Sequence, residues 1–541
     1  MSEDWVRAEQ GAAEGPSRLD AERERALLRS ALEAIARAPA LGERDLSRLL
    51  RRYRLPDGGV PSKNQLLRAY RRWCREEGRL PDPTLERRLI VKPTRTISGV
   101  APVTVLTAPY PCPGECVFCP AREGVPKSYL PDEPGARRGA SYGFDPYAQT
   151  AGRVAALMEI GHAVDKVELL ILGGTWSCYP PGYQEWFVRR CLEALNGQEA
   201  PSLEAAQRGN ERAPHRNVGL VIETRPDTVN RDEVRRLRWL GVTKVQLGVQ
   251  SLDDTILALN KRGHTVAQTR AAFRLLRLAG FKIVAHWMPN LLGATPAGDL
   301  ADFERLWADP ALRPDELKIY PTALLAGTEL HAAWVRGDYH PYDADTLIGL
   351  LAACKARIPP YVRLNRLMRD IPAPNIIAGV RRTNLREDVQ RAMRERGMVC
   401  RCIRCREVRG SVLDTGTLAY DHLAYETDAT GERFISAVTP TGRLAGFARL
   451  SLPRAAPPLE ELMGCAVIRE LHVYGPALEL GDRRAGAAQH AGLGTRLLEE
   501  ARQAARAAGF RRLAVIAAVG TRPYYEERGF RRGELYMIAD L

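Results

Sequence analysis

Three cysteines in one short segment are the residues with the clearest chemical potential in this sequence. The segment PYPCPGECVFCPA places Cys112, Cys116 and Cys119 at C-x3-C-x2-C spacing, directly after a predicted strand. A [4Fe–4S] cluster is usually held by four cysteines, so a loop that offers three leaves one iron open to an outside ligand. The alternative is a zinc knuckle whose fourth ligand comes from elsewhere in the chain.

A second group of cysteines lies much further along the chain. The segment VCRCIRCREVRG contains Cys400, Cys402 and Cys405 among several arginines. Three thiolates within six residues predict a closed, tetrahedral zinc site that takes one more ligand. The candidates for that ligand are Cys354, His422 and Cys465. A second iron–sulfur cluster and three free thiols are the alternatives.

A glycine-rich turn near the C-terminus predicts a site for an anion. In QHAGLGTRLLEEARQAARAAG a long helical pattern begins directly after the Q-x-x-G-x-G turn. Free N–H groups and the helix dipole at such a start favour a pyrophosphate. The residues concerned are Gln489, Gly492, Leu493, Gly494 and Thr495. Alternatively, the glycines only relieve crowding at the first turn.

Length and composition restrict the class of protein that carries these motifs. The chain has 541 residues, of which 45% are hydrophobic and 27% charged, which indicates several folded domains and excludes a small binding module or a wholly disordered chain. The net charge of +14 is consistent with a polyanionic partner. The start lacks a secretory signal and no apolar run is long enough to span a membrane, so we expect a soluble, cytoplasmic protein with reduced cysteines.

The order of predicted elements is that of an α/β protein. Between residues 91 and 384, β-rich runs alternate with helical patterns, which predicts βαβ units and a parallel sheet of six strands forming a partial barrel. Residues 385–412 form the cysteine-rich linker. Residues 413–541 predict a second α/β domain of mostly antiparallel strands. The strand segments are VTVLTA, VELLIL, VGLVI, KVQLGV, KIVAHW and ELKIY for the barrel.

Residues 1–90 predict a mobile tail followed by a basic helical segment. In KNQLLRAYRRWCREEG one face carries the apolar and aromatic side chains of Leu66, Leu67, Tyr70, Trp73 and Cys74. The opposite face carries Arg68, Arg71, Arg72 and Arg75. Such a segment would suit an RNA backbone, although a solvated helical face is the equal alternative.

Polar residues follow successive strands of the predicted barrel, where parallel strands place functional groups. Each alone is more often a hydrogen-bonded residue at a strand end, but their recurrence predicts a site. They are Gly173, Gly174 and Thr175 after the second strand, Glu223 and Arg225 after the third, Gln250 and Ser251 after the fourth, His286 in the fifth, and Lys318 and Tyr320 at the sixth.

The cysteine spacing and the barrel pattern together resemble the radical S-adenosylmethionine (SAM) superfamily. The resemblance implies that SAM chelates the open iron through its amino and carboxylate groups and is cleaved to a 5′-deoxyadenosyl radical. It also implies that the strand-end residues bind SAM. The glycines of VELLILGGTW would let the methionyl amine approach the backbone closely.

The C-terminal order of strand, glycine-rich turn, helix and strand resembles the GNAT-type N-acetyltransferase fold. The resemblance implies that acetyl-CoA binds in the splay between two strands. In such a fold Glu470 would act as a base, or serve only as a structural strand residue. Tyr524 or Tyr525, in GTRPYYEERGF, would contact the thioester sulfur and protonate the departing thiolate.

With both domains present, residues 90–541 resemble the Elongator catalytic-subunit family, the tRNA carboxymethyluridine synthases. Segments that match in family order include YGFDPYAQTAGRVAALMEIGH, ETRPD, LGVQS, NKRGHT, MPNLLG, LKIYPT, RELHVYG and YYEERGF. The three-cysteine spacing is shorter than in eukaryotic members and matches the common superfamily spacing. The resemblance implies a single-chain form, as in bacteria and archaea.

The resemblance also implies a reaction and its partners. The radical abstracts hydrogen from the methyl group of acetyl-CoA, the carbon radical adds to C5 of uridine 34 in a tRNA anticodon stem-loop, and thioester hydrolysis leaves a carboxymethyl group. Lys318, Tyr320, Arg363 and Arg366 would orient RNA or substrate at the barrel mouth. An electron donor for the cluster is required, and a homodimer is possible. A protein lysine acetyltransferase and a non-catalytic tRNA-binding scaffold are the alternatives.

Overall fold

The computed structural model of the protein describes residues 18–38, 42–90, 96, 99–382, 384–408, 414–474 and 492–541. The chain divides into two units, which we describe separately. The first comprises residues 1–95 and 155–163, and the second comprises residues 96–154 and 164–541. The predicted barrel and the predicted acetyltransferase domain therefore belong to one compact unit. Most of the expected N-terminal tail, residues 1–17, lies outside the described residues.

The first unit is helical, as predicted. Its helices are α1 (Arg18–Arg37), α2 (Glu43–Leu50), α3 (Lys63–Glu76) and α4 (Pro83–Leu89). Helix α3 begins with a capping box between Ser62 and Gln65. Its predicted apolar face is confirmed, because Leu66, Leu67, Tyr70 and Cys74 are buried and Trp73 packs against the same core.

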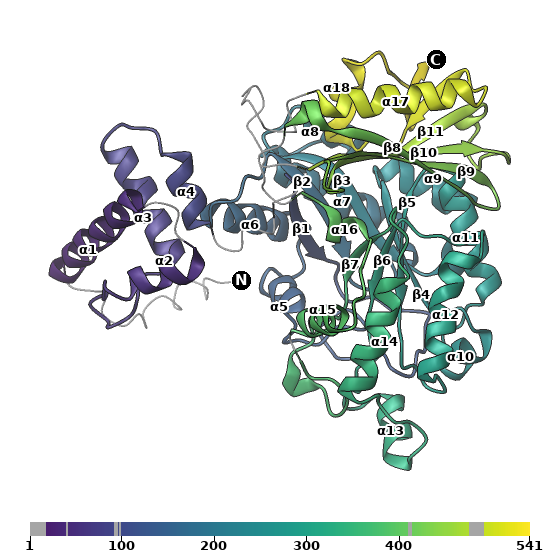
Figure 1. Ribbon diagram of the computed structural model, residues 1–541, viewed down its shortest axis with the longest axis horizontal. Helices are drawn as coiled ribbons and strands as arrows, with labels where there is room; N and C mark the ends of the chain where they lie inside the picture. The colour runs from purple at the N-terminus through teal and green to yellow at the C-terminus, as the bar shows by residue number, and fades with distance from the viewer. Residues whose placement is uncertain are drawn as a thin grey trace, which may run out of the picture. The chain divides into compact units, whose positions relative to one another are not determined.

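The second unit contains a parallel sheet in the order β1-β2-β3-β4-β5-β6-β7 (Figure 1). The six predicted strands are confirmed, and a seventh was missed because RLNR is short and polar. The strands are β1 (Ala101–Leu106), β2 (Lys166–Leu172), β3 (Arg216–Thr224), β4 (Lys244–Gln250), β5 (Lys282–Trp287), β6 (Glu316–Ile319) and β7 (Arg363–Arg366).

Helices alternate with these strands. Thr265 and Gln268 form a capping box at the start of α11, and Gly197 ends α7 in the left-handed conformation. The helices are α5 (Pro134–Ser141), α6 (Pro146–Glu159), α7 (Pro181–Asn196), α8 (Leu203–Asn210), α9 (Arg231–Leu240), α10 (Asp254–Leu259), α11 (Val266–Leu278), α12 (Pro296–Ala308), α13 (Glu329–Arg336), α14 (Ala344–Ala356), α15 (Leu385–Glu395) and α16 (Ile403–Arg406).

A second sheet of seven strands follows, in the order β13-β14-β12-β11-β10-β9-β8. Its strands are β8 (Ala419–Glu426), β9 (Thr430–Val438), β10 (Leu444–Pro453), β11 (Cys465–Val473), β12 (Arg512–Val515), β13 (Arg531–Arg532) and β14 (Met537–Asp540), with helices α17 (Leu493–Ala507) and α18 (Arg522–Glu526). Helix α17 lies on one face of this sheet and the barrel lies on the other (Figure 1). The predicted mixed domain is confirmed.

A buried ionic network joins the second sheet to the barrel. Arg469 of β11 donates to both carboxylate oxygens of Asp315, at 2.6 and 2.7 Å, and to Glu432 of β9 at 2.7 Å. The side chains of Arg469 and Asp315 are 0% exposed and that of Glu432 is 1% exposed. Arg449 of β10 bonds to Glu470 at 2.8 Å. Asp315 directly precedes β6, so the network contacts the amino ends of the barrel strands.

Backbone also approaches backbone closely at this junction. Gly520, which follows β12, packs against the start of β3, where an added Cβ would lie 2.7 Å from the carbonyl oxygen of Asn217. A residue larger than glycine would push the two domains apart there.

Among the helices that the structure describes, none is long and apolar enough to cross a membrane.

We expect Arg469→Met to destabilise the protein strongly, because Asp315 and Glu432 stay buried but lose the hydrogen bonds that Arg469 donates to both. Arg277 and Arg449 lie near Asp315 only at 3.7 and 3.6 Å. Breaking a buried ion pair on one side costs about 3–5 kcal/mol. The matched control is Arg531→Met, whose pair with Asp540 spans side chains that are 80% and 69% exposed and should contribute about 0–1 kcal/mol. Thermal unfolding of both variants tests this, and equal melting temperatures would contradict a structural role for the network.

Candidate active site

The three loop cysteines lie beyond the carboxyl end of β1. The Sγ atom of Cys112 lies 3.6 Å from the hydroxyl of Thr175, which follows β2. Arg262 donates to the Sγ atom of Cys116 at 3.4 Å. Burial, and then the proximity of Cys116, raise the pKa of the Cys119 thiol to about 12. A bound metal would favour the thiolate form of this residue.

The two cysteine groups differ in how far their sulfurs are spread. Around one tetrahedral zinc ion the sulfurs are roughly 3.8 Å apart, given Zn–S bonds of about 2.3 Å. The sulfurs of Cys400, Cys402 and Cys405 all lie within 4.8 Å of one another, and no other His, Cys, Asp or Glu side chain in the described part of the chain forms such a group. The loop cysteines do not form such a group in the described chain, so the compact arrangement that suits a single ion is found at the linker cysteines.

Buried polar atoms without partners surround the cysteine loop. The side-chain atoms Gln250 Oε1, Arg225 Nη1 and Arg262 Nε are buried and have no hydrogen-bond partner among the described residues. Gln250 also adopts φ 66°, which is uncommon for a residue other than glycine. Unsatisfied buried donors and acceptors call for a ligand or water. A ligand with carboxylate and amine groups, such as SAM, fits these residues.

Gly173 occupies a position that admits no side chain. It has φ +145°, and an added Cβ would lie 1.9 Å from the hydroxyl oxygen of Thr107. Gly173 is buried, so the GGT segment packs closely against Thr107 next to Cys112. Gly174 and Thr175 follow it directly.

Polar side chains fill the barrel interior near the same end. His286 Nδ1 lies 3.3 Å from a carboxylate oxygen of Glu223, and its Nε2 lies 3.0 Å from the Gln246 amide. Burial, followed by the positive charge of Lys318, lowers the pKa of His286, so the ring is neutral. The pKa of Glu223 is lowered, because its hydrogen bond with His286 and the positive charges of Lys318 and Arg369 outweigh the effect of burial. The ring of Tyr320 meets His286 edge-on, with centroids 5.4 Å apart.

A neutral His286 also fixes the orientation of Gln246. If Nδ1 donates to Glu223, then Nε2 accepts, and the amide nitrogen of Gln246 must face it. This orientation also gives a partner to the Gln246 nitrogen, which otherwise has none. The structure thus brings together the predicted residues from β3, β5 and β6.

The two arginines of β7 lie at opposite ends of that strand. Arg366 pairs with Asp370 at 2.7 Å and is 48% exposed, at the carboxyl end. Arg363 instead donates to Glu407 at 2.8 Å and to Tyr474 at 2.9 Å. It therefore lies at the end of the barrel facing the second sheet, and the prediction that it lies at the barrel mouth is wrong.

The second sheet has the predicted splay between two strands. Strand β11 pairs with β12 only over Cys465–Ile468, and Arg469 forms a bulge opposite β10. Within the described residues, the segment from Arg469 to Val473 therefore has no strand paired on its β12 side. Helix α17 begins after Gly492, and a Cβ added at Gly494 would lie 3.8 Å from the Val473 side chain, so the first turn of the helix, with its free N–H groups, lies beside this segment. Gln489 lies outside the described residues.

The two tyrosines differ in their surroundings. A Cβ added at Gly494 would lie 2.7 Å from Tyr524 Oη, so the Tyr524 hydroxyl lies against the first turn of α17. Arg528 packs over the Tyr524 ring at 3.7 Å and donates to the Thr495 hydroxyl at 3.2 Å. Tyr525 is 7% exposed and packs against Phe530 in the core. Tyr524 is therefore the tyrosine placed at the glycine-rich turn.

Glu470 is engaged in the ionic network. Lys282 donates to one of its oxygens at 2.9 Å and Arg449 to the other at 2.8 Å. Burial raises its pKa, but these cations outweigh burial and hold the pKa well below its usual range. A carboxylate held in this way is a weak proton acceptor, so the geometry favours the structural alternative for Glu470.

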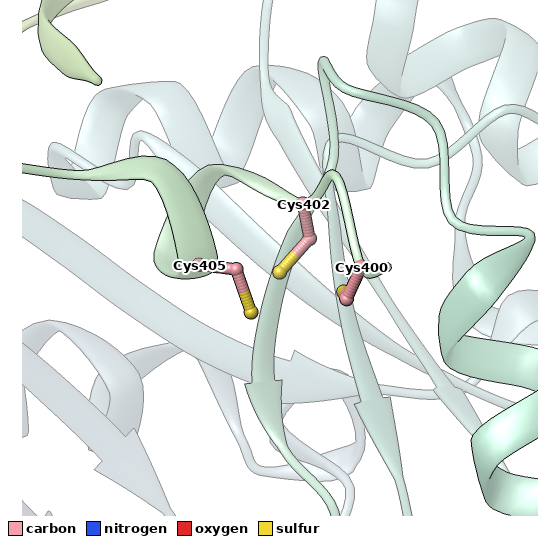
Figure 2. A group of neighbouring side chains, drawn as sticks. All are labelled: Cys400, Cys402 and Cys405. Carbon is pink, nitrogen blue, oxygen red and sulfur yellow. The ribbon is translucent and has the colours of Figure 1, made fainter. Parts of the chain in front are cut away.

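The linker cysteines form the compact group drawn in Figure 2. They lie between the two sheets, because Ile403 bonds to the backbone of Val362 before β7 and Val408 bonds to that of Leu444 in β10. His422 bonds to Glu500 at 3.2 Å, and Cys465 contacts backbone carbonyls of its own turn. In the described part of the chain, the predicted fourth ligands do not lie with the three linker cysteines. This holds for His422, Cys465 and Cys354.

Sequence reasoning missed several residues of these sites. Arg262, which contacts Cys116, stands in NKRGHT, but neither periodicity nor spacing identifies it. Arg369 packs over the Tyr129 ring at 4.7 Å and pairs with Glu133 at 3.0 Å, near Glu223. These contacts span segments far apart in the sequence, so no local signal reveals them.

Comparison with known proteins agrees with this architecture. The Radical SAM superfamily matches residues 110–303, the Radical_SAM C-terminal domain matches residues 314–395, and the Acetyltransferase (GNAT) family matches residues 410–530. The radical SAM cofactors are therefore SAM and a [4Fe–4S] cluster, and that of the GNAT domain is acetyl-CoA.

The chain aligns with its relatives over most of its length and most of theirs. The tRNA uridine(34) acetyltransferase of Dehalococcoides mccartyi is 44% identical over 83% of this chain and 99% of its own. Elongator complex protein 3 of Danio rerio is 37% identical over 84% of this chain and 86% of its own. The solved structure of archaeal Methanocaldococcus infernus Elp3 with an N-terminal deletion superposes with a TM-score of 0.73, at 37% identity, over 82% of this chain and all of that chain. The chain belongs to the family of the tRNA uridine(34) acetyltransferases and Elongator complex protein 3.

Proposed function

We propose that the protein carboxymethylates C5 of uridine 34 in tRNA, with acetyl-CoA as the carbon donor and SAM as the radical source. The observation that carries the proposal is that one compact unit holds a three-cysteine loop with unsatisfied polar groups around it and a splayed strand with a glycine-rich turn. The names of the relatives support uridine 34 as the target. A protein lysine acetyltransferase would need only the second of these sites.

At the barrel mouth, Cys112, Cys116 and Cys119 would hold the cluster. Gly173 would let the GGT backbone pack against Thr107 beside it, which places the segment for SAM. When bound, the cluster and SAM would supply radical chemistry at an unactivated C–H bond, which acid–base side chains cannot provide. Gly174, Thr175, Gln250 and Ser251 would orient SAM. The chain's own residues thus position the reactants and keep water away.

Lys318 and Tyr320 would orient the uracil or the acetyl group inside the barrel. The Lys318 ammonium lies 5.8 Å from the Tyr320 ring centroid, and the Lys318 side chain is buried beside His286 and Glu223. A cation and a neutral imidazole in a water-poor site can polarise a carbonyl without giving up a proton.

We propose that the anticodon stem-loop presents the uridine as an unstacked base, with exposed arginines of α3 binding RNA phosphates. Arg68, Arg72 and Arg75 are exposed on that helix. Three further expectations from the sequence stay predictions. They are a cytoplasmic location, an electron donor that reduces the cluster, and a homodimer.

We further propose that Cys400, Cys402 and Cys405 bind zinc. Three sulfurs within 4.8 Å of one another fit one tetrahedral ion, and their contact with both sheets suits a structural site. The fourth ligand would be water or a group outside the described residues.

The proposal predicts labelled 5-carboxymethyluridine from acetyl-CoA labelled in its methyl group. The protein with a reconstituted cluster is incubated anaerobically with SAM, reductant, labelled acetyl-CoA and bulk tRNA, and the nucleosides are analysed by mass spectrometry. Cys116→Ala should abolish the product because a cluster ligand is lost. Cys465→Ala, which removes a cysteine outside both groups, should retain it.

Label on protein lysines with none in RNA would instead support the lysine acetyltransferase. RNA binding without any labelled product would support the non-catalytic scaffold.

A second prediction concerns SAM binding. Gly173→Ala should weaken SAM binding strongly, because its Cβ would collide with Thr107 and the residue has a positive φ. Gly182→Ala at the start of α7 is the matched control, since nothing lies within 4 Å of its added Cβ. Calorimetric titration of reconstituted protein with SAM compares them. Equal affinity in both variants would remove Gly173 from the SAM site.

A third prediction separates the two tyrosines. Tyr524→Phe should slow thiol release from acetyl-CoA by about 10²-fold or more, because the acid for the departing thiolate is lost. Acetyl-CoA affinity should change little. Tyr525→Phe should retain turnover, because this hydroxyl is buried in the core. If Tyr525→Phe slows thiol release more than Tyr524→Phe does, Tyr525 rather than Tyr524 is the acid for the departing thiolate.

A further inference from the structure

His472 lies in the part of β11 that leaves its partner strand. Pairing with β12 ends at Ile468, and His472 pairs only with Phe447 of β10. The next residue, Val473, lies 3.8 Å from the position of a Cβ added at Gly494, in the first turn of α17. His472 therefore belongs to the open edge along which the GNAT fold binds acetyl-CoA.

The His472 side chain points toward the barrel. Alternation along β11 places it on the same face as Glu470, which bonds to Lys282 of β5. Tyr474, on the same face, accepts a hydrogen bond from Arg363 of β7. The imidazole packs against aromatic rings, with centroids 5.9 Å from Phe447 and 4.5 Å from Tyr474.

Charged groups from three barrel strands and from β11 itself surround the imidazole. They are Glu168 of β2, Lys282 of β5, Arg363 of β7 and Glu470. Burial lowers the pKa of His472 to about 4, because Arg363 and Lys282 add to its effect while Glu470 and Glu168 oppose it. The ring is therefore neutral at physiological pH.

The Nε2 atom of His472 is buried and has no hydrogen-bond partner among the described residues. A neutral imidazole with Nδ1 protonated carries a free lone pair on Nε2. Glu470, two residues earlier, has both carboxylate oxygens occupied by cations. His472 is thus the available proton acceptor on this face of the splayed segment.

We propose that His472 accepts the proton of the water that cleaves the thioester, an inference that rests on the proposed function. The water oxygen bonds to the thioester carbonyl carbon as its proton passes to Nε2. The C–S bond then breaks with its electron pair on sulfur, and the thiolate is protonated, which leaves a carboxylic acid and the free thiol of CoA. No oxidant or reductant takes part. Tyr524, at the first turn of α17, donates its proton to the thiolate. The imidazolium then releases its proton to solvent and the Tyr524 phenolate takes one from solvent, which restores both groups.

The first test is thiol release from acetyl-CoA in the presence of tRNA, without SAM or reductant. His472→Gln should slow release by about 10²-fold or more, the usual effect of a lost general base. The matched control is His422→Gln, a histidine of β8 that bonds to Glu500, and it should behave as wild type. Acetyl-CoA affinity and melting temperature report whether His472→Gln still folds and binds, and His472→Asn is the second variant.

The second test follows the RNA under the full radical conditions. If His472 serves hydrolysis only, His472→Gln should accumulate uridine joined to CoA through an uncleaved thioester, which mass spectrometry detects as a heavy tRNA adduct. A proton signal of the His472 imidazole that titrates near pH 4 in wild type would agree with a neutral base. Thiol release should then be independent of pH above about pH 5 and fall below it.

The outcomes separate the inference from the function on which it rests. If the wild-type protein makes no labelled carboxymethyluridine, the proposed function is overturned. The thiol-release assay still tests the role of His472 in that case. Wild-type thiol release in a folded His472→Gln variant overturns the role of His472. Loss of release in Glu470→Gln, with release retained in His472→Gln, would return the role to Glu470. Wild type that releases no thiol at all would also overturn the inference.

Discussion

The bidentate pair between Arg469 and Asp315 is the interaction on which the arrangement of the two catalytic domains depends. Neither side chain is exposed. Arg469 lies in β11 of the second sheet, and Asp315 directly precedes β6 of the barrel sheet. Ions removed from water in this way require partners on every side, and Glu432, Arg449 and Glu470 supply them. Such a network stabilises one relative position of the two sheets and excludes sliding. The acetyltransferase sheet is therefore held against the amino ends of the barrel strands.

This position separates the two chemistries along the barrel. The cysteine loop lies beyond the carboxyl end of β1, whereas β11 faces the opposite end. The barrel interior between them is polar, with Lys244 bonded to Glu168 at 2.7 Å and to Glu316 at 3.1 Å. Closed eight-stranded TIM barrels, by contrast, usually fill their interior with branched apolar side chains. Polar and charged side chains therefore line the barrel interior between the cysteine loop and the end that faces β11.

Local patterns in the sequence predicted most of the fold and the chemical groups of both sites. Six barrel strands, the apolar face of α3 and the two cysteine groups each have a periodicity or a spacing that short segments contain. The seventh strand lacks such a pattern, because Arg363 and Asn365 are polar on a short strand whose partners come from distant segments. For the same reason the sequence could not show that Arg363 faces the second sheet.

Glu470 and His472 show why the role of a site residue depends on contacts between domains. In RELHVYG both side chains point to the same face, and the carboxylate is the more familiar base. The cations that occupy Glu470 come from β5 and β10. Burial between the domains keeps His472 neutral, and an arginine of β7 adds to that effect. The same network that fixes the domains thus removes one base and leaves another. A proton acceptor inside an ionic interface must be neutral, because a charged one would be paired, and His472 meets that condition.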